Sequence, residues 1–188
     1  MGAKFDFRLV DPVSAAKIYF GIWESAEIRL AKKYISKNDV VLELGSSVGV
    51  MLSTIVSNVV IKKYIAVEAS PTAILVLDKI IKNLGNQDIF LVQAAISYSK
   101  EEFVNFSESS FTGSRLSYLS KGSSVECIQK CQAVTLSELL QKENILNTEY
   151  VLVTDIEGAE ADIFINDKVA LESCKKIICE LDETEKYS

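Results

Sequence analysis

The sequence contains no histidine among its 188 residues, and that absence removes several kinds of chemistry. Serine and cysteine nucleophiles that depend on an imidazole base cannot be assembled within this chain. Zinc sites with histidine ligands are excluded for the same reason. Catalytic proton transfer must therefore use carboxylates, lysines, tyrosines, thiols, the substrate or water.

Basic residues and cysteines are also few. The chain has 20 Lys and Arg against 26 Asp and Glu, which gives a formal net charge of -6. Binding along a nucleic-acid backbone is driven by clustered basic side chains, so we expect no nucleic-acid partner. The cysteines do not follow zinc-ligand spacing and are too sparse for a disulfide framework. We therefore expect reduced structural thiols, and no metal site, at Cys127, Cys131, Cys174 and Cys179.

Long apolar runs are missing as well. No stretch reaches the roughly 18 apolar residues that a membrane-spanning helix needs. The first residues, Met1–Phe7, do not show a basic region followed by an apolar one. We expect a soluble, cytoplasmic protein. Because 48% of its residues are hydrophobic, the chain can form a single domain over residues 1–188.

Short β-branched runs alternate with helical patterns through most of the chain. Two helices are expected within residues 1–36, the first from Asp11-Pro12 and the second over 23–35. The expected core, residues 37–181, has buried strands at 39–44, 63–68, 89–96, 150–155 and 176–181 and helices at 48–60, 72–84 and 136–140. This order favours an α/β fold with a Rossmann-like, doubly wound and mostly parallel sheet.

The middle of the chain is less regular. Residues 102–106 and 125–134 are expected to add two strands. Residues 107–124 are rich in Ser and Gly and are expected to form an exposed inserted loop. Two helix starts have clear signals, Ser70 before Pro71 and Thr135 with Glu138 three residues later.

Two strings of residues follow the first and second expected strands, and ligands of open α/β sheets bind at that edge. The first is Glu43-Leu44-Gly45-Ser46-Ser47-Val48-Gly49. Gly45 permits a tight turn and close approach of a ligand, and Gly49 permits the next helix to pack on the sheet. The second string consists of one residue, Glu68, whose carboxylate can accept hydrogen bonds from two ribose hydroxyls. A plain strand-to-helix turn and a solvated acid are the alternative interpretations.

A third string, Asp155-Ile156-Glu157-Gly158-Ala159-Glu160, gathers three carboxylates at the end of the fourth strand of the expected core. Carboxylates this close raise one another's pKa, which suits a general base. Alternatively, Asp155 caps the next helix, and Glu157 and Glu160 are first-turn acids favoured by the helix dipole. The two interpretations are compatible.

Together these strings resemble the S-adenosylmethionine-dependent methyltransferases of the FkbM type. That family shows an acid-x-Gly-x-x-x-Gly turn, an acid ending the second strand, a Ser/Gly-rich segment before a Thr-Leu helix start, and Asp-x-Glu-Gly-x-Glu. The matching residues here are Glu43–Gly49, Glu68, Ser110–Leu116 with Thr135-Leu136, and Asp155–Glu160. The likeness covers roughly residues 18–181 and implies a fold of the class I methyltransferase type.

The resemblance implies methyl transfer from S-adenosylmethionine to an oxygen of a small hydroxylated metabolite or sugar, without a metal. Asp155, and after it Glu157, would act at the acceptor. The cofactor would contact Glu43, Gly45, Ser46, Ser47, Gly49, Glu68, Ala69, Ala94, Ala95 and Asp155. Candidate substrate contacts are Glu160 and, in the expected loop, Phe111, Arg115 and Tyr118, where the guanidinium suits a carboxylate or phosphate. A solvated connector is the alternative for the loop.

The chain departs from the family pattern at a few positions. Val153 stands where a lysine is common, Ala69 follows Glu68 in place of proline, and Ser46-Ser47 replaces Ala-Asn. Class I methyltransferases usually have two strands after the fifth, so either this sequence is cut short or its sheet ends early. The fifth strand would then be an open edge that a second subunit has reason to cover.

Two other functions remain open. A nicotinamide-dependent oxidoreductase would share the turn and Glu68, although its usual G-x-G-x-x-G turn needs glycine where Ser47 stands. A non-catalytic module that binds S-adenosylmethionine would be consistent with Val153. Fold alone does not separate these functions.

Overall fold

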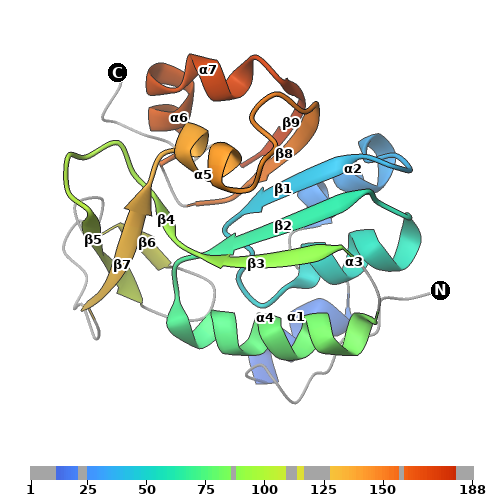
Figure 1. Ribbon diagram of the computed structural model, residues 1–188. Coiled ribbons are helices and arrows are strands. Elements are labelled where there is room, and N and C mark those ends of the chain that lie inside the picture. Colours follow the sequence, from blue (N-terminus) through green and yellow to red (C-terminus); the bar gives the residue numbers. More distant parts are fainter. Residues whose placement is uncertain are drawn as a thin grey trace.

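Five parallel strands form the main sheet of the computed structural model (Figure 1). The structure describes residues 12–20, 25–85, 88–108, 114–116, 128–156 and 159–180. The strands lie in the order β3-β2-β1-β8-β9. Their bounds are β1 Val40–Leu44, β2 Lys63–Glu68, β3 Ile89–Gln93, β8 Tyr150–Thr154 and β9 Cys174–Cys179. The predicted α/β fold with a mostly parallel sheet is confirmed, and the last strand begins and ends two residues earlier than expected.

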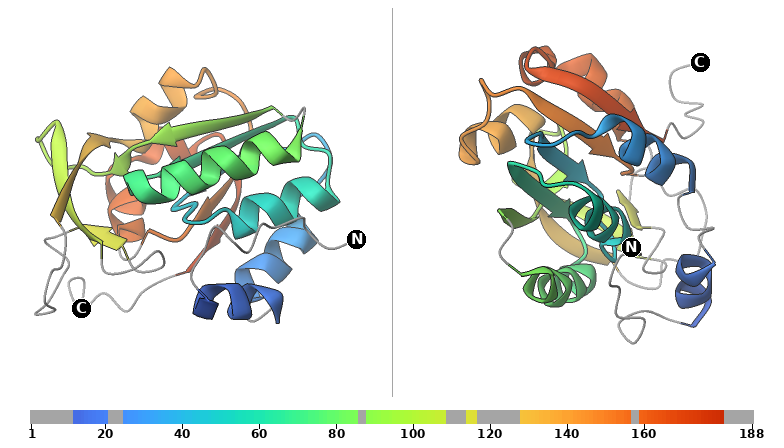
Figure 2. Two further views of the ribbon diagram at one scale, coloured as in Figure 1. Left: turned by 90° about the horizontal axis from the view of Figure 1, so that it is seen from below. Right: turned by 90° about the vertical axis from the view of Figure 1, so that its right-hand side faces the viewer.

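Helices cover both faces of this sheet, as the doubly wound prediction requires (Figure 2). One face packs against α2, α3 and α4, and the other against α5, α6 and α7. Ile18 of α1 packs against the first of these clusters. The bounds are α1 Pro12–Tyr19, α2 Ser25–Tyr34, α3 Val50–Asn58, α4 Pro71–Leu84, α5 Leu136–Lys142, α6 Glu160–Asn166 and α7 Lys168–Leu171.

The alternation of side chains along β1 explains why the sheet is covered on both sides. Val41 belongs to the cluster with α2, α3 and α4, whereas Leu42 and Leu44 belong to the cluster with α5, α6 and α7. All five residues of β1 are buried. A strand with two apolar faces reads as a continuous hydrophobic run, and this is why the sequence identified it.

Two helix starts confirm their sequence signals. At the start of α4, the Ser70 hydroxyl accepts a hydrogen bond from the Ala73 amide at 3.1 Å, and Pro71 is the first helical residue. At the start of α5, both hydrogen bonds of the capping box between Thr135 and Glu138 are formed. These local signals fix helix starts because they satisfy amides that the helix itself leaves without partners.

A second, smaller sheet has the order β4-β7-β5-β6 and lies beyond the carboxyl ends of the main strands (Figures 1 and 2). Its strands are β4 Ala95–Ile96, β5 Phe103–Glu108, β6 Ser114–Leu116 and β7 Ile128–Val134. β4 pairs with β7 in parallel, and β5 pairs with β6 and β7 in antiparallel fashion.

This second sheet corrects two sequence predictions. The predicted strand over 89–96 is interrupted at Ala94, because Ala95 and Ile96 leave β2 and pair with Ala133 and Val134 instead. The predicted loop over 107–124 contains the end of β5 and all of β6, since residues 106–108 pair with 114–116. The remainder of that segment lies outside the described residues.

The two outer strands of the main sheet each have one strand partner within the described ranges. β9 pairs with β8, and β3 pairs with β2. A second subunit at the β9 edge stays a prediction. No helix in the described part of the chain has the length and apolar character to span a membrane.

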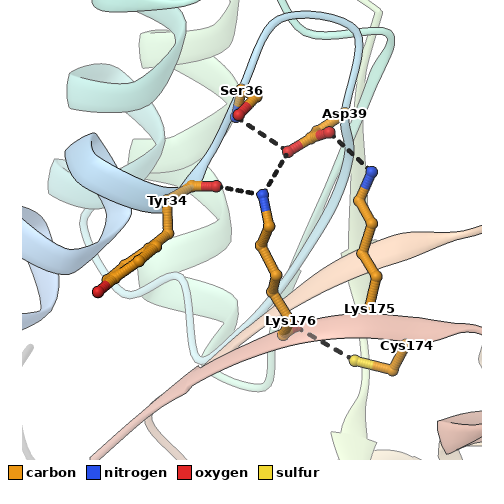
Figure 3. Close-up of polar contacts among 6 residues, drawn as sticks. All are labelled: Tyr34, Ser36, Asp39, Cys174, Lys175 and Lys176. Atoms are coloured by element: carbon orange, nitrogen blue, oxygen red, sulfur yellow. Dashed lines mark hydrogen bonds and ion pairs between the residues drawn. The ribbon is translucent and has the colours of Figure 1, made fainter.

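An ion-pair cluster ties β9 to the turn before β1, at the edge opposite the three strings (Figure 3). Asp39 is buried and accepts hydrogen bonds from the Ser36 amide at 2.9 Å and from Lys175 Nζ at 2.8 Å. Lys176 Nζ lies 3.8 Å from the same carboxylate and donates to the Tyr34 carbonyl at 2.6 Å. Two neighbouring lysines of β9 therefore hold the end of α2 and the start of β1.

This cluster predicts how stability depends on pH. Burial by itself would raise the pKa of Asp39, but the hydrogen bonds from Lys175 and Ser36 and the lysine charges hold it below its usual value. The hydrogen bond to Asp39 raises the pKa of Lys175. A lowered acid pKa stabilises the fold above the unfolded value of about 3.9, and a raised lysine pKa stabilises it below about 10.4. The stabilisation is thus complete near neutral pH and is lost at either extreme.

We expect Asp39→Asn to lower the free energy of unfolding at pH 7 by about 1 to 3 kcal/mol, because the lysines lose a charged partner. The difference from the wild type should shrink as the pH falls through the folded pKa of Asp39. Urea unfolding at several pH values measures this. Asp78→Asn is the control, since the exposed pair of Asp78 with Lys82 is expected to contribute about 0.5 kcal/mol or less. An equal loss of unfolding free energy in Asp78→Asn and Asp39→Asn would contradict the stabilising role of the Asp39 cluster.

Candidate functional site

The turn after β1 lies beside the point where the strand order reverses, between β1 and β8. The amides of Gly45 and Ser46 both donate to the Val67 carbonyl, at 2.9 and 3.0 Å, so the turn remains attached to the end of β2. Gly45, Ser47 and Gly49 all have positive φ, at 81°, 45° and 73°. In open α/β sheets, such an order reversal is where ligands bind.

The two glycines of the turn are required for different reasons. A Cβ on Gly45 would lie 2.0 Å from the carbonyl oxygen of Asp155, so the first and third strings are in direct backbone contact. A Cβ on Gly49 would lie 2.9 Å from a methyl carbon of Leu77. The next helix, α3, packs on the sheet as expected, and Gly49 also leaves room for α4. The close contact is with α4, because α3 and α4 lie side by side over the same face.

Glu68 links the turn after β1 to the start of α4. Its carboxylate is buried and accepts hydrogen bonds from the amides of Ser47 and Ser70, both at 2.8 Å. The Ala94 amide donates to its carbonyl at 3.1 Å, which brings the end of β3 to the same place. Three predicted cofactor positions, Ala69, Ala94 and Ala95, thus surround the end of β2, with Ala94 and Ala95 buried. Ribose binding by Glu68 stays a prediction.

Glu43 lies on the other side of the turn and is buried within β1. It accepts a hydrogen bond from the Tyr64 hydroxyl at 2.9 Å. Glu43, Val153 and Asp155 line a cavity of about 10 Å³, together with Glu27 of α2. Sequence reasoning did not identify Glu27 and Tyr64, because only tertiary packing brings them to β1.

Two buried hydroxyls lie at this edge without a hydrogen-bond partner in the described part of the chain. They are Ser46 Oγ, in the turn, and Thr154 Oγ1, at the end of β8. A buried hydroxyl left unpaired costs about 1 to 3 kcal/mol. Such groups on either side of the order reversal are therefore candidates for hydrogen bonds with a ligand.

The third string begins at the end of β8. The Asp155 amide donates to the Leu44 carbonyl at 3.0 Å, and the Asp155 side chain is half-buried. Glu160 is buried and accepts a hydrogen bond from the Ile156 amide at 2.6 Å. Glu157, the second candidate catalytic residue, lies outside the described residues. Asp155 and Glu160 thus have different surroundings, although both belong to the same string of six residues.

An apolar cluster joins the second sheet to the strings. Ala95, Val104, Cys131 and Ala159 form it, and Ala69 and Ile156 pack against it. Burial raises the pKa of Cys131 to about 11, and the charge of Glu68 adds to the shift. The Cys131 thiol is therefore neutral at physiological pH. Because Cys131 is in β7 and Glu68 ends β2, the effect of Glu68 also indicates that β7 lies close to the end of β2. Sequence reasoning missed this neighbour of Glu68, since no local pattern links residues 68 and 131.

A groove of about 560 Å³ lies between the end of β3, β7 and α5. Ala94 and Val92 form part of its wall, with charged side chains that include Lys100, Glu138 and Lys142. The groove thus adjoins Ala94, one of the predicted cofactor contacts. The candidate substrate residues Phe111 and Tyr118 lie outside the described residues, and of Arg115 only the backbone, in β6, is described.

The main sheet is doubly wound, with a glycine turn after β1, a buried acid at the end of β2 and an acidic string at the order reversal. These features define a Rossmann-like domain, a type that commonly binds nucleotides. A comparison with models of protein families matches residues 43–188 to the methyltransferase FkbM domain. The match covers most of the chain, and the chain belongs to this family. The predicted family is thereby confirmed.

Solved structures give local similarities only. Trm5b of Pyrococcus abyssi is 17% identical over 39% of this chain and 23% of that one, with a TM-score of 0.33. The PRMT1 enzyme-prozyme complex of Trypanosoma brucei with AdoHcy is 23% identical over 42% and 25%, with a TM-score of 0.34. A putative RNA methyltransferase of Pyrococcus horikoshii, PH1948, is 19% identical over 50% and 44%, with a TM-score of 0.33. The chain thus spans less than half the length of each. A search of curated proteins found no match.

Proposed function

We propose that this protein transfers a methyl group from S-adenosylmethionine to an oxygen of a small hydroxylated metabolite or sugar. Membership of the FkbM methyltransferase family supports the reaction class. One structural observation carries the assignment of the site. The glycine turn packs against the Asp155 backbone and is held by the Glu68 carboxylate, so all three strings meet at the order reversal.

The residues at this edge fit the cofactor. When bound, S-adenosylmethionine supplies an activated methyl group, because a sulfonium is a good leaving group. Glu43 and Asp155 offer negative charge for its ammonium, and the start of α3 offers amides for its carboxylate. The buried hydroxyl of Ser46 would gain a partner, and Glu68 would hold the ribose. The alanines after β3, Ala94 and Ala95, would flank the adenine.

Asp155 is the proposed catalytic residue. Its backbone is fixed by Leu44 on one side and by Gly45 on the other, which places its side chain at the order reversal. There it would orient the acceptor hydroxyl or take its proton, with Glu157 as the second candidate. Most of the rate would come from holding acceptor and methyl in line, an effect that can contribute about 7 to 11 kcal/mol. Arg115, Tyr118 and Glu160 remain proposed substrate contacts.

The experiment has two stages. Calorimetry with S-adenosylhomocysteine and with NAD⁺ decides between a methyltransferase and an oxidoreductase. Incubation with methyl-labelled S-adenosylmethionine and a panel of hydroxylated acceptors then decides between an enzyme and a binding module. Transfer of label to an acceptor oxygen is the expected result. Binding of S-adenosylhomocysteine with no transfer to any acceptor would favour the module.

Glu68→Ala is expected to weaken binding of S-adenosylhomocysteine by about 1 to 3 kcal/mol, or roughly 5- to 150-fold. The cause is the loss of charged hydrogen bonds, both to the ligand and to the amide of Ser47 in the turn. Glu68→Gln, which keeps an acceptor oxygen, should lose less. The exposed Glu149, which precedes β8 at the opposite edge of the sheet, serves as the control in a Glu149→Ala variant. Unchanged affinity in Glu68→Ala would remove this residue from the site.

A further inference from the structure

The peptide bond between Asp155 and Ile156 is held from both sides. Its carbonyl oxygen lies so close to Gly45 that a Cβ there would approach to 2.0 Å. Its amide, the N–H of Ile156, donates to Glu160 Oε1 at 2.6 Å. Ile156, the residue that follows Asp155, is therefore held by an acid four residues further along the chain. This fixes the direction in which the backbone leaves the end of β8.

The surroundings of Glu160 favour this contact. The side chain is 2% exposed, although Glu160 is the first residue of α6. Burial raises the pKa of the Cys179 thiol, and the charge of Glu160 adds to the shift, so Glu160 also lies near the end of β9. A hydrogen bond to a carboxylate is shorter and stronger than one between neutral groups. The distance to the Ile156 amide is in keeping with such a bond.

We infer that Glu160 is a positioning residue, which sets the orientation of the Asp155 carboxylate by holding the peptide bond after it. The inference rests on the proposed function, in which Asp155 acts at the acceptor. It adds a contact within the protein to the substrate contact proposed for Glu160. The competing interpretation is that Glu160 only stabilises α6 through the helix dipole, as an acid in the first turn can.

Two conservative substitutions separate these interpretations. Glu160→Gln removes the charge but keeps an oxygen at the right reach. Glu160→Asp keeps the charge but withdraws the oxygen by one methylene. The matched control is Asp162→Asn, which removes the other acid from the first turn of α6. If Glu160 positions Asp155, the Gln variant should behave more like the wild type than the Asp variant does. The helix-dipole interpretation predicts the reverse, because only the Asp variant keeps the charge.

The measurements are amide hydrogen exchange at Ile156 and the carboxyl-carbon NMR signal of Asp155, without ligand. In Glu160→Asp, we expect exchange at Ile156 to accelerate about tenfold or more, since a bond to a charged group is lost. The Asp155 signal should also move, while the amides of β8 keep their protection. Glu160→Gln, which keeps a neutral acceptor, should show clearly smaller changes than Glu160→Asp, and Asp162→Asn should show neither change. The inference would be overturned if Glu160→Asp kept the wild-type exchange rate at Ile156 and the wild-type Asp155 signal. It would also be overturned if Glu160→Gln changed both as much as Glu160→Asp does.

Two further measurements keep the test decisive. In the wild type, the Ile156 amide should be protected from exchange, which requires no variant to fold. Exchange at the rate of a solvent-exposed amide would overturn the contact. S-adenosylhomocysteine should move the Asp155 signal in the wild type and in Glu160→Gln, and less in Glu160→Asp. If the wild type does not bind this ligand, the proposed function fails, while the ligand-free measurements still decide whether Glu160 holds the peptide bond.

Discussion

Gly45→Ala is expected to be the most damaging single substitution in the turn, with a loss of about 4 kcal/mol or more in the free energy of unfolding. The added Cβ would meet the Asp155 carbonyl oxygen at 2.0 Å, and φ at this position is 81°. The two nearest atoms belong to the Asp155 backbone, so the clash cannot be relieved by the movement of a flexible side chain. To accommodate the Cβ, the turn after β1 and the end of β8 must move apart. Because this separates the residues of the proposed site, binding of S-adenosylhomocysteine should be lost.

Two other glycines with positive φ are matched controls. Gly85→Ala introduces a Cβ into open space, so it should cost only the backbone strain, about 1 to 3 kcal/mol. In Gly49→Ala the new atom would meet the Leu77 side chain at 2.9 Å, and that side chain can shift. Its cost should therefore fall between the other two. Denaturant unfolding of the three variants gives the order. A loss in Gly45→Ala no greater than in Gly85→Ala would contradict the contact between the strings.

Asp155→Asn is expected to lower methyl transfer by about 10² to 10⁴-fold. The loss of S-adenosylhomocysteine affinity should be far smaller, because Glu43 still offers negative charge for the ligand's ammonium. The substitution keeps the backbone contacts with Leu44 and Gly45, so the turn remains in place. It removes the carboxylate that would orient or deprotonate the acceptor. Single-turnover transfer of labelled methyl to an acceptor from the panel measures the chemical step, and calorimetry measures binding.

The control for this variant is Asp162→Asn, which removes a neighbouring acid from α6. It should transfer methyl at the wild-type rate. If Asp155→Asn also transfers at that rate, Asp155 is not the catalytic residue. The second candidate, Glu157, would then be tested in the same way.

Most of the main sheet could be predicted from the sequence because its strands are buried on both faces. β1 and β2 appear as continuous apolar runs, and a glycine or an acid marks the end of each. The starts of α4 and α5 were predictable for a different reason. Their capping residues satisfy helix amides within three residues, so the whole interaction lies in one short stretch of sequence.

The second sheet could not be predicted in the same way. Residues 95–96 were correctly expected to be extended, but their partner strand ends at Val134, and periodicity does not identify partners that far apart. The end of β5 and β6 lie in a segment rich in Ser and Gly, where a weak strand pattern is indistinguishable from a loop.

At the site, the sequence identified the strings but not their mutual contacts. Glu68 was expected at the ribose, and the structure shows that its carboxylate also holds the amides of Ser47 and Ser70. The approach of Gly45 to Asp155 depends on the parallel pairing of β1 with β8, which only the fold establishes. Glu27 and Cys131 reach the site from α2 and β7, with no local signal.

Calorimetry of the wild-type protein against S-adenosylhomocysteine, with NAD⁺ in a parallel titration, tests the central claim most directly. The claim is that the carboxyl edge of the main sheet, where the three strings meet, binds S-adenosylmethionine. Stoichiometric binding of S-adenosylhomocysteine, weakened in Glu68→Ala and absent in Gly45→Ala, is the predicted result. Binding of NAD⁺ in its place, or no binding of either ligand by the folded protein, would contradict it.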